Sequence, residues 1–251
     1  MSRHVLILGG TGEALALARS LAEQRPDLAV TTSLAGVTET PVQPPGRVRS
    51  GGFGGAAGLA AWLGDEAVDL LVDATHPFAA TMARHAAEAA ALAGVPRLKL
   101  VRAMWPQRHG DRWIMVPDAA AAARALADLG ARRVFLTLGV RDLDAFAGMT
   151  GTAFTLRMIA PPPEPLPLAD AVLLLARGPF DGAAEEALMR EHRFDALVTK
   201  ASGGAATQGK IDAARVLGLP VVMIARPPLP PGERAADVAG ALAWIGERLA
   251  A

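Results

Sequence analysis

The chain has 251 residues, no net formal charge and a mean hydropathy of +0.28, with 51% hydrophobic residues. This length and composition allow one large or two small cores without cross-links, and the charge balance argues against a general nucleic-acid binder. The absence of Cys and Tyr excludes disulfides, thiolate nucleophiles, cysteine-ligated metals and a tyrosine proton donor.

The first half of the chain alternates short β-branched runs with alanine-rich segments, which predicts an α/β fold with largely parallel sheets. The expected strands are residues 5–8, 28–33, 47–50, 70–73 and 98–101, and the expected helices are residues 13–24, 55–63 and 79–93. No apolar stretch is long enough to cross a bilayer, and no secretory leader precedes the first strand. We therefore expect a cytoplasmic protein that does not engage membranes.

A segment rich in Pro, Trp, Gly and charge at residues 104–112 interrupts the alternation, which then resumes. The later expected strands are 113–116, 134–138, 154–158, 172–176, 197–199 and 221–224, and the helices are 119–129, 183–191, 208–217 and 235–249. We therefore predict two α/β domains, residues 1–103 and 104–251, with a cleft between them. The C-terminal helix could pack on either domain.

A glycine-rich turn follows the first strand in the segment VLILGGTGE at residues 5–13. Such a turn brings backbone N–H groups and the positive end of a helix dipole close to a phosphate, which indicates a nucleotide site. The cofactor-binding residues expected there are Gly9, Gly10, Thr11, Gly12 and Glu13. Leu15 occupies the third glycine position of G-x-G-x-x-G, so an ordinary strand–helix turn is the alternative.

The second strand ends at Ser33, where an NAD-binding fold commonly carries an acidic residue. A carboxylate at this position binds the ribose 2′-hydroxyl of NAD, whereas a neutral side chain leaves room for the 2′-phosphate of NADP. Ser33 therefore predicts NADP(H) as the cofactor. Arg47 or Arg49 could supply the contact to that phosphate, and the sequence does not decide between them.

The segment DATHPFA, residues 73–79, joins a strand to the next helix. Thr75 could cap that helix or contact a ligand, and His76 could donate a hydrogen bond or a proton at the site. A structural, helix-capping histidine is the alternative. The other histidines show no metal-ligand spacing, so we expect no metal.

A cation follows or ends each of five apolar strands, at the edge where ligands bind in open α/β sheets. These residues are Arg102, Arg141, Arg177, Lys200 and Arg226. Together they suit a ligand with several carboxylates or phosphates, and surface ion pairs with nearby aspartates are the alternative. The segment from Thr199 to Gly204, with Ser202 and two glycines, resembles a second anion cradle, and a flexible loop is its alternative.

Five motifs in this order resemble the precorrin-6A reductase family of cobalamin (corrin) biosynthesis. They are GGTGE at 9–13, DATHPFA at 73–79, TLG-x-R at 137–141, RGPF at 177–180, and the TK-x-SGG loop at 199–204 leading to Lys210. The IARP segment at 224–227 also fits, whereas RAMW at 102–105 departs from the expected Arg-Pro before the tryptophan. The motifs span nearly the whole chain.

The resemblance implies two Rossmann-like domains, NADPH as the hydride source, and reduction of one double bond of precorrin-6A to give precorrin-6B. Thr75 and His76 would then lie near the nicotinamide, and Lys200 or His76 could assist protonation. The five strand-end cations would complement the carboxylates of the macrocycle, and Arg102, Lys200 and Ser202 would anchor those carboxylates or the phosphates of the cofactor. We expect a monomer or a weak homo-oligomer, and the substrate could be metal-free or cobalt-bearing.

Two other functions fit parts of the pattern. A cofactor-free tetrapyrrole lyase of the uroporphyrinogen synthase type would also need a cationic cleft, but it would not need the glycine turn. A non-catalytic dinucleotide-binding module would bind nucleotide without turnover. The cations of the second half argue against the latter, because they indicate a second ligand.

Overall fold

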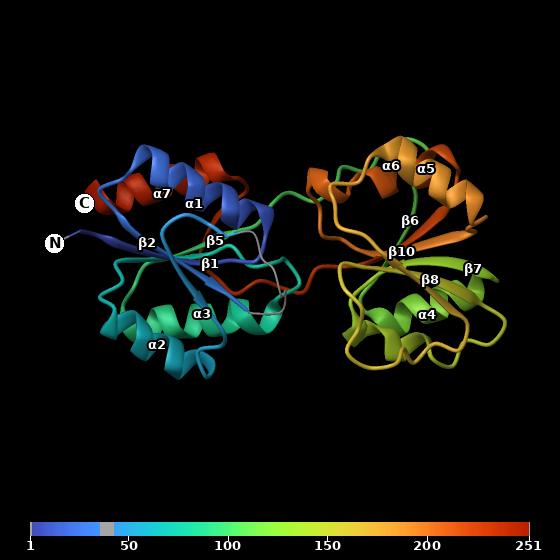
Figure 1. Cartoon of the computed structure of the whole chain (residues 1–251), viewed down its shortest axis with the longest axis horizontal. Helices are drawn as coiled ribbons and strands as arrows, with labels where there is room; N and C mark the ends of the chain where they lie inside the picture. Colours follow the sequence, from blue (N-terminus) through green and yellow to red (C-terminus); the bar gives the residue numbers. More distant parts are fainter. Residues whose placement is uncertain (1, 36–42, 251) are drawn as a thin grey trace. The chain divides into compact units, whose positions relative to one another are not determined.

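The computed structural model describes residues 2–35 and 43–250 as parts of two compact units. The first unit contains residues 1–103 and 227–251, and the second contains residues 104–226 (Figure 1). We expect residues 104–251 to form the second domain, with the C-terminal helix on either domain, whereas the structure places residues 227–251, including that helix, in the first unit. The boundary expected after residue 103 coincides with the structural one. The cleft between the domains stays a prediction.

The first unit is built on a six-stranded sheet in the order β12-β5-β4-β1-β2-β3, with every neighbouring pair parallel. Its strands are β1 (His4–Leu8), β2 (Ala29–Leu34), β3 (Arg47–Ser50), β4 (Leu70–Asp73), β5 (Arg97–Leu100) and β12 (Glu233–Ala235). This order is typical of dinucleotide-binding folds, in which the chain leaves the first strand in opposite directions.

Helices cover both faces of the first sheet because β1 is apolar on both of its faces. Val5 and Ile7 pack against α1 (Gly12–Gln24) and α7 (Val238–Ala250). Leu6 and Leu8 pack on the opposite face, toward α2 (Gly55–Asp65) and α3 (Ala80–Ala93) (Figure 1). Burial of each such side chain contributes about 1.5–3 kcal/mol. A continuous apolar strand is what a parallel sheet covered on both faces requires.

The second unit contains another six-stranded parallel sheet, in the order β6-β11-β10-β7-β8-β9. Its strands are β6 (Arg112–Val116), β7 (Arg133–Thr137), β8 (Ala153–Met158), β9 (Ala171–Leu175), β10 (Ala196–Lys200) and β11 (Pro220–Ile224). Its helices are α4 (Ala119–Asp128), α5 (Gly182–Glu191) and α6 (Gly209–Val216), with short 3₁₀ helices η1 (Val140–Phe146) and η2 (Ala205–Thr207).

The two sheets share one spatial layout, but their sixth strands come from different places in the chain. Strands β1 to β5 correspond in position to β7 to β11. The sixth place is filled in the first sheet by β12, which follows the whole second unit, and in the second sheet by β6, which precedes the rest of that unit. Each of these strands leads into a helix, α7 or α4. The two units therefore repeat one architecture with an exchanged sixth strand.

The strands and helices expected from sequence are confirmed to within a few residues. The exception is β12 (Glu233–Ala235), because we expected a helix to begin at residue 235, whereas α7 begins at Val238. Within the described residues, the helices are too short or too polar for any of them to cross a membrane.

Candidate functional site

The glycine turn lies at the carboxyl ends of β1 and β4, where the strand order of the first sheet reverses. Ligands of open parallel sheets bind outside this point. Gly10 has a φ of +101°, and a Cβ there would meet no atom within 4 Å, so the glycine is needed for its backbone conformation. Thr11 caps α1 by accepting a hydrogen bond from Ala14 N at 3.1 Å, and it donates one to the Ala74 carbonyl at 2.8 Å. The turn is thereby tied to the loop after β4.

Glu13, in the first turn of α1, forms an ion pair with Arg102 at 2.9 Å. An unpaired carboxylate at the start of α1 would repel a phosphate, and the guanidinium offsets that charge. Arg102 follows β5 of the first sheet, so it lies at this edge, whereas the other four predicted strand-end cations belong to the second sheet.

The end of β2 carries a serine–arginine pair on the neighbouring strands β2 and β3. Arg49 donates hydrogen bonds to Ser33 Oγ at 2.9 Å and to the carbonyls of Gly51 and Gly52 at 3.0 Å. Its guanidinium carbon lies 3.7 Å from the centre of the Phe53 ring, which fixes its plane. Burial lowers the pKa of Arg49, but a guanidinium stays charged. Arg47 instead pairs with Glu66, so the structure distinguishes two arginines that the sequence could not.

A buried ion pair supports the loop between β4 and α3. Lys99 Nζ lies 2.9 Å from Asp73 Oδ1, and both side chains are at most 2% exposed. The same Nζ donates to the carbonyl of Thr75 at 3.0 Å. Burial lowers the pKa of Lys99, which the carboxylate of Asp73 opposes. Sequence reasoning missed this pair, although a lysine inside the apolar strand RLKL was a signal.

The residues of this loop that are predicted to lie at the site are Thr75 and His76, and neither side chain caps α3, because the N-cap is Ala79 without a side-chain hydrogen bond. The capping interpretation of both residues is therefore wrong. Thr75 Oγ1 donates to Asp73 Oδ1 at 2.6 Å. His76 Nδ1 accepts from Phe78 N at 3.3 Å, which places the proton of a neutral ring on Nε2.

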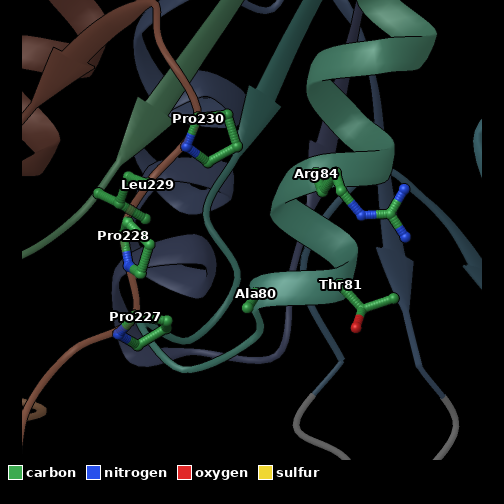
Figure 2. A pocket seen from close by; sticks show the side chains of 7 residues that line it. All are labelled: Ala80, Thr81, Arg84, Pro227, Pro228, Leu229 and Pro230. Carbon is green, nitrogen blue, oxygen red and sulfur yellow. The ribbon is translucent and has the colours of Figure 1, made fainter. Parts of the chain in front are cut away.

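A groove of about 480 Å³ runs beside α3 in the first unit (Figure 2). Its walls are formed by Ala80, Thr81 and Arg84 on α3 and by the proline-rich segment 227–230. The guanidinium of Arg84 points away from the prolines, so the groove is largely apolar (Figure 2). Its wall residue Ala80 directly follows the loop that carries His76, and the groove could hold a flat apolar group beside that loop.

The remaining predicted cations lie at the carboxyl edge of the second sheet and differ in their contacts. Lys200, the last residue of β10, forms an ion pair with Asp142 at 2.6 Å. Arg226, after β11, donates to the carbonyls of Ala201 at 2.7 Å and Ser202 at 3.0 Å. Its guanidinium thus holds the predicted anion loop in place. Arg141 and Arg177 are exposed.

The loop from Ala201 to Gly204 is ordered by several contacts. Gly203 and Gly204 adopt φ values of +65° and +85°, and Trp105 Nε1 donates to the Gly204 carbonyl at 2.9 Å. Ser202, which is 9% exposed, donates through Oγ to the Lys200 carbonyl at 3.2 Å. These contacts argue against the flexible-loop alternative. Among the described residues, His, Asp and Glu form no cluster that could hold a metal ion.

Comparison with known proteins shows one consistent match over nearly the whole chain. The family model described as "Precorrin-6x reductase CbiJ/CobK" matches residues 4–246. The chain is 54% identical to the precorrin-6A reductase of Rhodococcus erythropolis over 97% of both sequences, and 44% identical to that of Rhodobacter capsulatus over 97% of this chain and 96% of the relative. A solved structure of "CobK precorrin-6A reductase" matches with a TM-score of 0.92 and 43% identity, covering 98% of this chain and 97% of that one.

Proposed function

The chain belongs to the precorrin-6x reductase CbiJ/CobK family, and we propose that it catalyses the NADPH-dependent reduction of precorrin-6A to precorrin-6B in cobalamin biosynthesis. The observation that carries the cofactor assignment is the Ser33–Arg49 pair beside the glycine turn of the first sheet. Both features lie at the edge of a parallel sheet whose strand order is that of dinucleotide-binding folds.

The residues of the first unit fit a dinucleotide. The open space at Gly10 and the N-terminus of α1 can receive a diphosphate, because nothing lies within 4 Å of a Cβ built there. Ser33 and Arg49 can bind a 2′-phosphate, Arg49 as a bidentate donor. Thr75 and His76 then lie on the nicotinamide side, with the proton of His76 on Nε2 as a hydrogen-bond donor. When bound, the nicotinamide supplies the hydride.

The substrate assignment rests on charge. A macrocycle with acetate and propionate side chains needs several cations, and Arg141, Arg177 and Lys200 lie at the carboxyl edge of the second sheet. Arg226 acts by holding the backbone of Ser202. Arg102 contributes from the first unit, where it pairs with Glu13. The chain's part in the reduction is then orientation and charge, with Lys200 or His76 able to pass a proton.

We propose the metal-free macrocycle as the natural substrate, because both relatives cited above are named for precorrin-6A and share 54% and 44% of their residues with this chain.

The test is NADPH oxidation by the purified protein with authentic precorrin-6A, followed by loss of nicotinamide absorbance and by the mass of the product. A product two hydrogens heavier supports the proposal. Binding of NADPH without turnover would favour a dinucleotide-binding module. Loss of precorrin-6A without any NADPH binding would favour a cofactor-free tetrapyrrole enzyme.

A further inference from the structure

Lysine is rare in this chain, and its positions are informative. Of the 25 cationic Lys and Arg residues, only Lys99, Lys200 and Lys210 are lysines. Arg fills the other positions, which include most of the exposed ones. A guanidinium keeps its charge in proteins, whereas a buried ammonium can lose its proton. Two of the three lysines, Lys99 and Lys210, are buried.

Lys210 is a buried lysine to which the proposed reaction assigns no role. It is the second residue of α6 and only 5% exposed. Its Nζ donates to Thr137 Oγ1 at 3.0 Å, and Thr137 in turn donates to the Val198 carbonyl at 3.1 Å. The other contact of Nζ is the ring of Trp105, at 5.9 Å from the centroid. An ammonium has three N–H donors, and among the described residues Thr137 Oγ1 is the side-chain oxygen that accepts from Nζ.

The surrounding charges leave Lys210 without a counter-ion. Arg157 on β8 and Glu185 on α5 form a buried pair, with Nη2 and Oε2 2.8 Å apart, so this carboxylate is already bound. On α6 itself, Asp212 pairs with Arg215. Within the described residues, no carboxylate reaches ion-pair distance of Lys210 Nζ. The pKa of Lys210 is lowered to about 7, first by burial and then by the nearby charge of Arg157, while Glu185 opposes the shift.

Lys210, on α6, is bonded to the end of β7 at the edge of the second sheet where ligands of parallel sheets bind. Thr137 ends β7, and the strand order of the second sheet reverses between β7 and β10, as it does at the glycine turn of the first sheet. Trp105 contacts Lys210 with its ring and the Gly204 carbonyl with its Nε1. The uncompensated ammonium therefore lies beside the predicted anion loop, at the place where a ligand of this sheet would bind.

We propose that Lys210 binds a carboxylate of the macrocyclic substrate at the carboxyl edge of the second sheet, and that it takes up one proton from solvent as that carboxylate binds. This inference rests on the proposed function for the identity of the ligand. The anion supplies the missing counter-charge, so it stabilises the protonated form of Lys210 and raises its pKa in the complex.

Proton uptake makes substrate affinity depend on pH with a defined sign. Below pH 7 Lys210 is already charged in the free protein, and affinity does not depend on its protonation. Above pH 7 the neutral form must be protonated on binding, so affinity falls about tenfold per pH unit until the pKa of the complex is reached. This dependence belongs to substrate binding and appears in KM.

The first experiment is direct titration of the wild-type protein by NMR with ¹³C-labelled lysine. Only three lysine side chains contribute signals, and Lys99→Arg, Lys200→Arg and Lys210→Arg variants assign them, by elimination if one fails to fold. We expect the Lys210 signal to titrate near pH 7 in the free protein and at least one pH unit higher with precorrin-6A bound. A Lys210 that stays charged to pH 9 in the free protein, or one whose titration the substrate does not move, would overturn the proposal.

Two further experiments show whether the anion comes from the macrocycle or from the cofactor, and distinguish failure of this proposal from failure of the proposed function. Addition of NADP⁺ alone should leave the Lys210 titration unchanged, and a shift with NADP⁺ would refute a macrocycle carboxylate as the ligand. Lys210→Met should lose the rise of KM above pH 7, whereas Arg190→Met, at an exposed position of α5 outside the proposed site, should retain it. If the wild-type protein does not oxidise NADPH with precorrin-6A, the proposed function fails, while the titration of the free protein still reports on Lys210.

Discussion

Replacement of Arg49 by Met tests whether the Ser33–Arg49 pair selects NADPH. Arg49 is held by three hydrogen bonds and by the ring of Phe53 before any ligand binds, so little side-chain entropy remains to be lost. A charge-assisted hydrogen bond of this kind contributes about 1.5–3 kcal/mol, which is roughly 10- to 150-fold in Kd. We expect a loss of NADPH affinity within this range, toward its upper end, and a change of less than about threefold for NADH, since NADH lacks the 2′-phosphate.

The assay is titration with each cofactor, followed by nicotinamide fluorescence at two salt concentrations. Arg47→Met is the matched control, because Arg47 lies on the same strand but pairs with Glu66. The NADPH affinity of the wild type should weaken with salt more steeply than that of Arg49→Met. The reasoning is refuted if Arg49→Met weakens both cofactors equally, or if Arg47→Met has as large an effect on NADPH.

Three more outcomes follow from the described contacts. Ser33→Asp should weaken NADPH at least about tenfold and spare NADH in the same titration, because a carboxylate repels the 2′-phosphate; an unchanged preference contradicts this. Asp73→Leu should lower the free energy of unfolding in urea by about 3–5 kcal/mol, because it leaves the ammonium of Lys99 buried and unpaired. The double variant Asp73→Leu/Lys99→Met should recover most of that loss. A loss below about 1 kcal/mol in Asp73→Leu argues against a stabilising ion pair. Lys210 titrates near pH 7 when folded and near 10.4 when unfolded, so the unfolded state binds more protons between these values and wild-type stability should rise with pH there. Lys210→Met should lack this rise in stability with pH and should be more stable than the wild type at pH 6. If the free energies of unfolding of the two proteins depend on pH in the same way, this prediction is wrong.

The local elements of the fold could be predicted because their signals are local. The run Val5–Leu8 is apolar throughout, and the glycines after it end a strand and begin a helix. The strand β12 (Glu233–Ala235) could not be predicted in this way. It is three residues long, two of them charged, and it exists because it pairs with β5, far earlier in the chain. Its pattern is decided by its partner and not by its own composition.

The candidate site was predicted where a motif carries it and missed where the fold assembles it. The glycine turn and Ser33 could be identified from their places after predicted strands. Arg49 is distinguished from Arg47 by the ion pair between Arg47 and Glu66, which only the fold brings together. The role of Lys99 depends on the parallel register that places it opposite Asp73. Pairing across strands that are distant in sequence leaves no local periodicity to detect.

Because of the exchanged sixth strand, the two units acquire their last strands at different times during synthesis. Residues 104–226 form one continuous segment, so the second unit has all its strands as soon as β11 has emerged from the ribosome. The first unit begins earlier but stays incomplete, because the free edge of β5 and the face that α7 covers wait for the last residues of the chain. Domains generally fold as units while the chain grows. The portion translated first is therefore finished last, and a chain that stops after residue 226 would retain a whole second sheet beside a first sheet with an open edge.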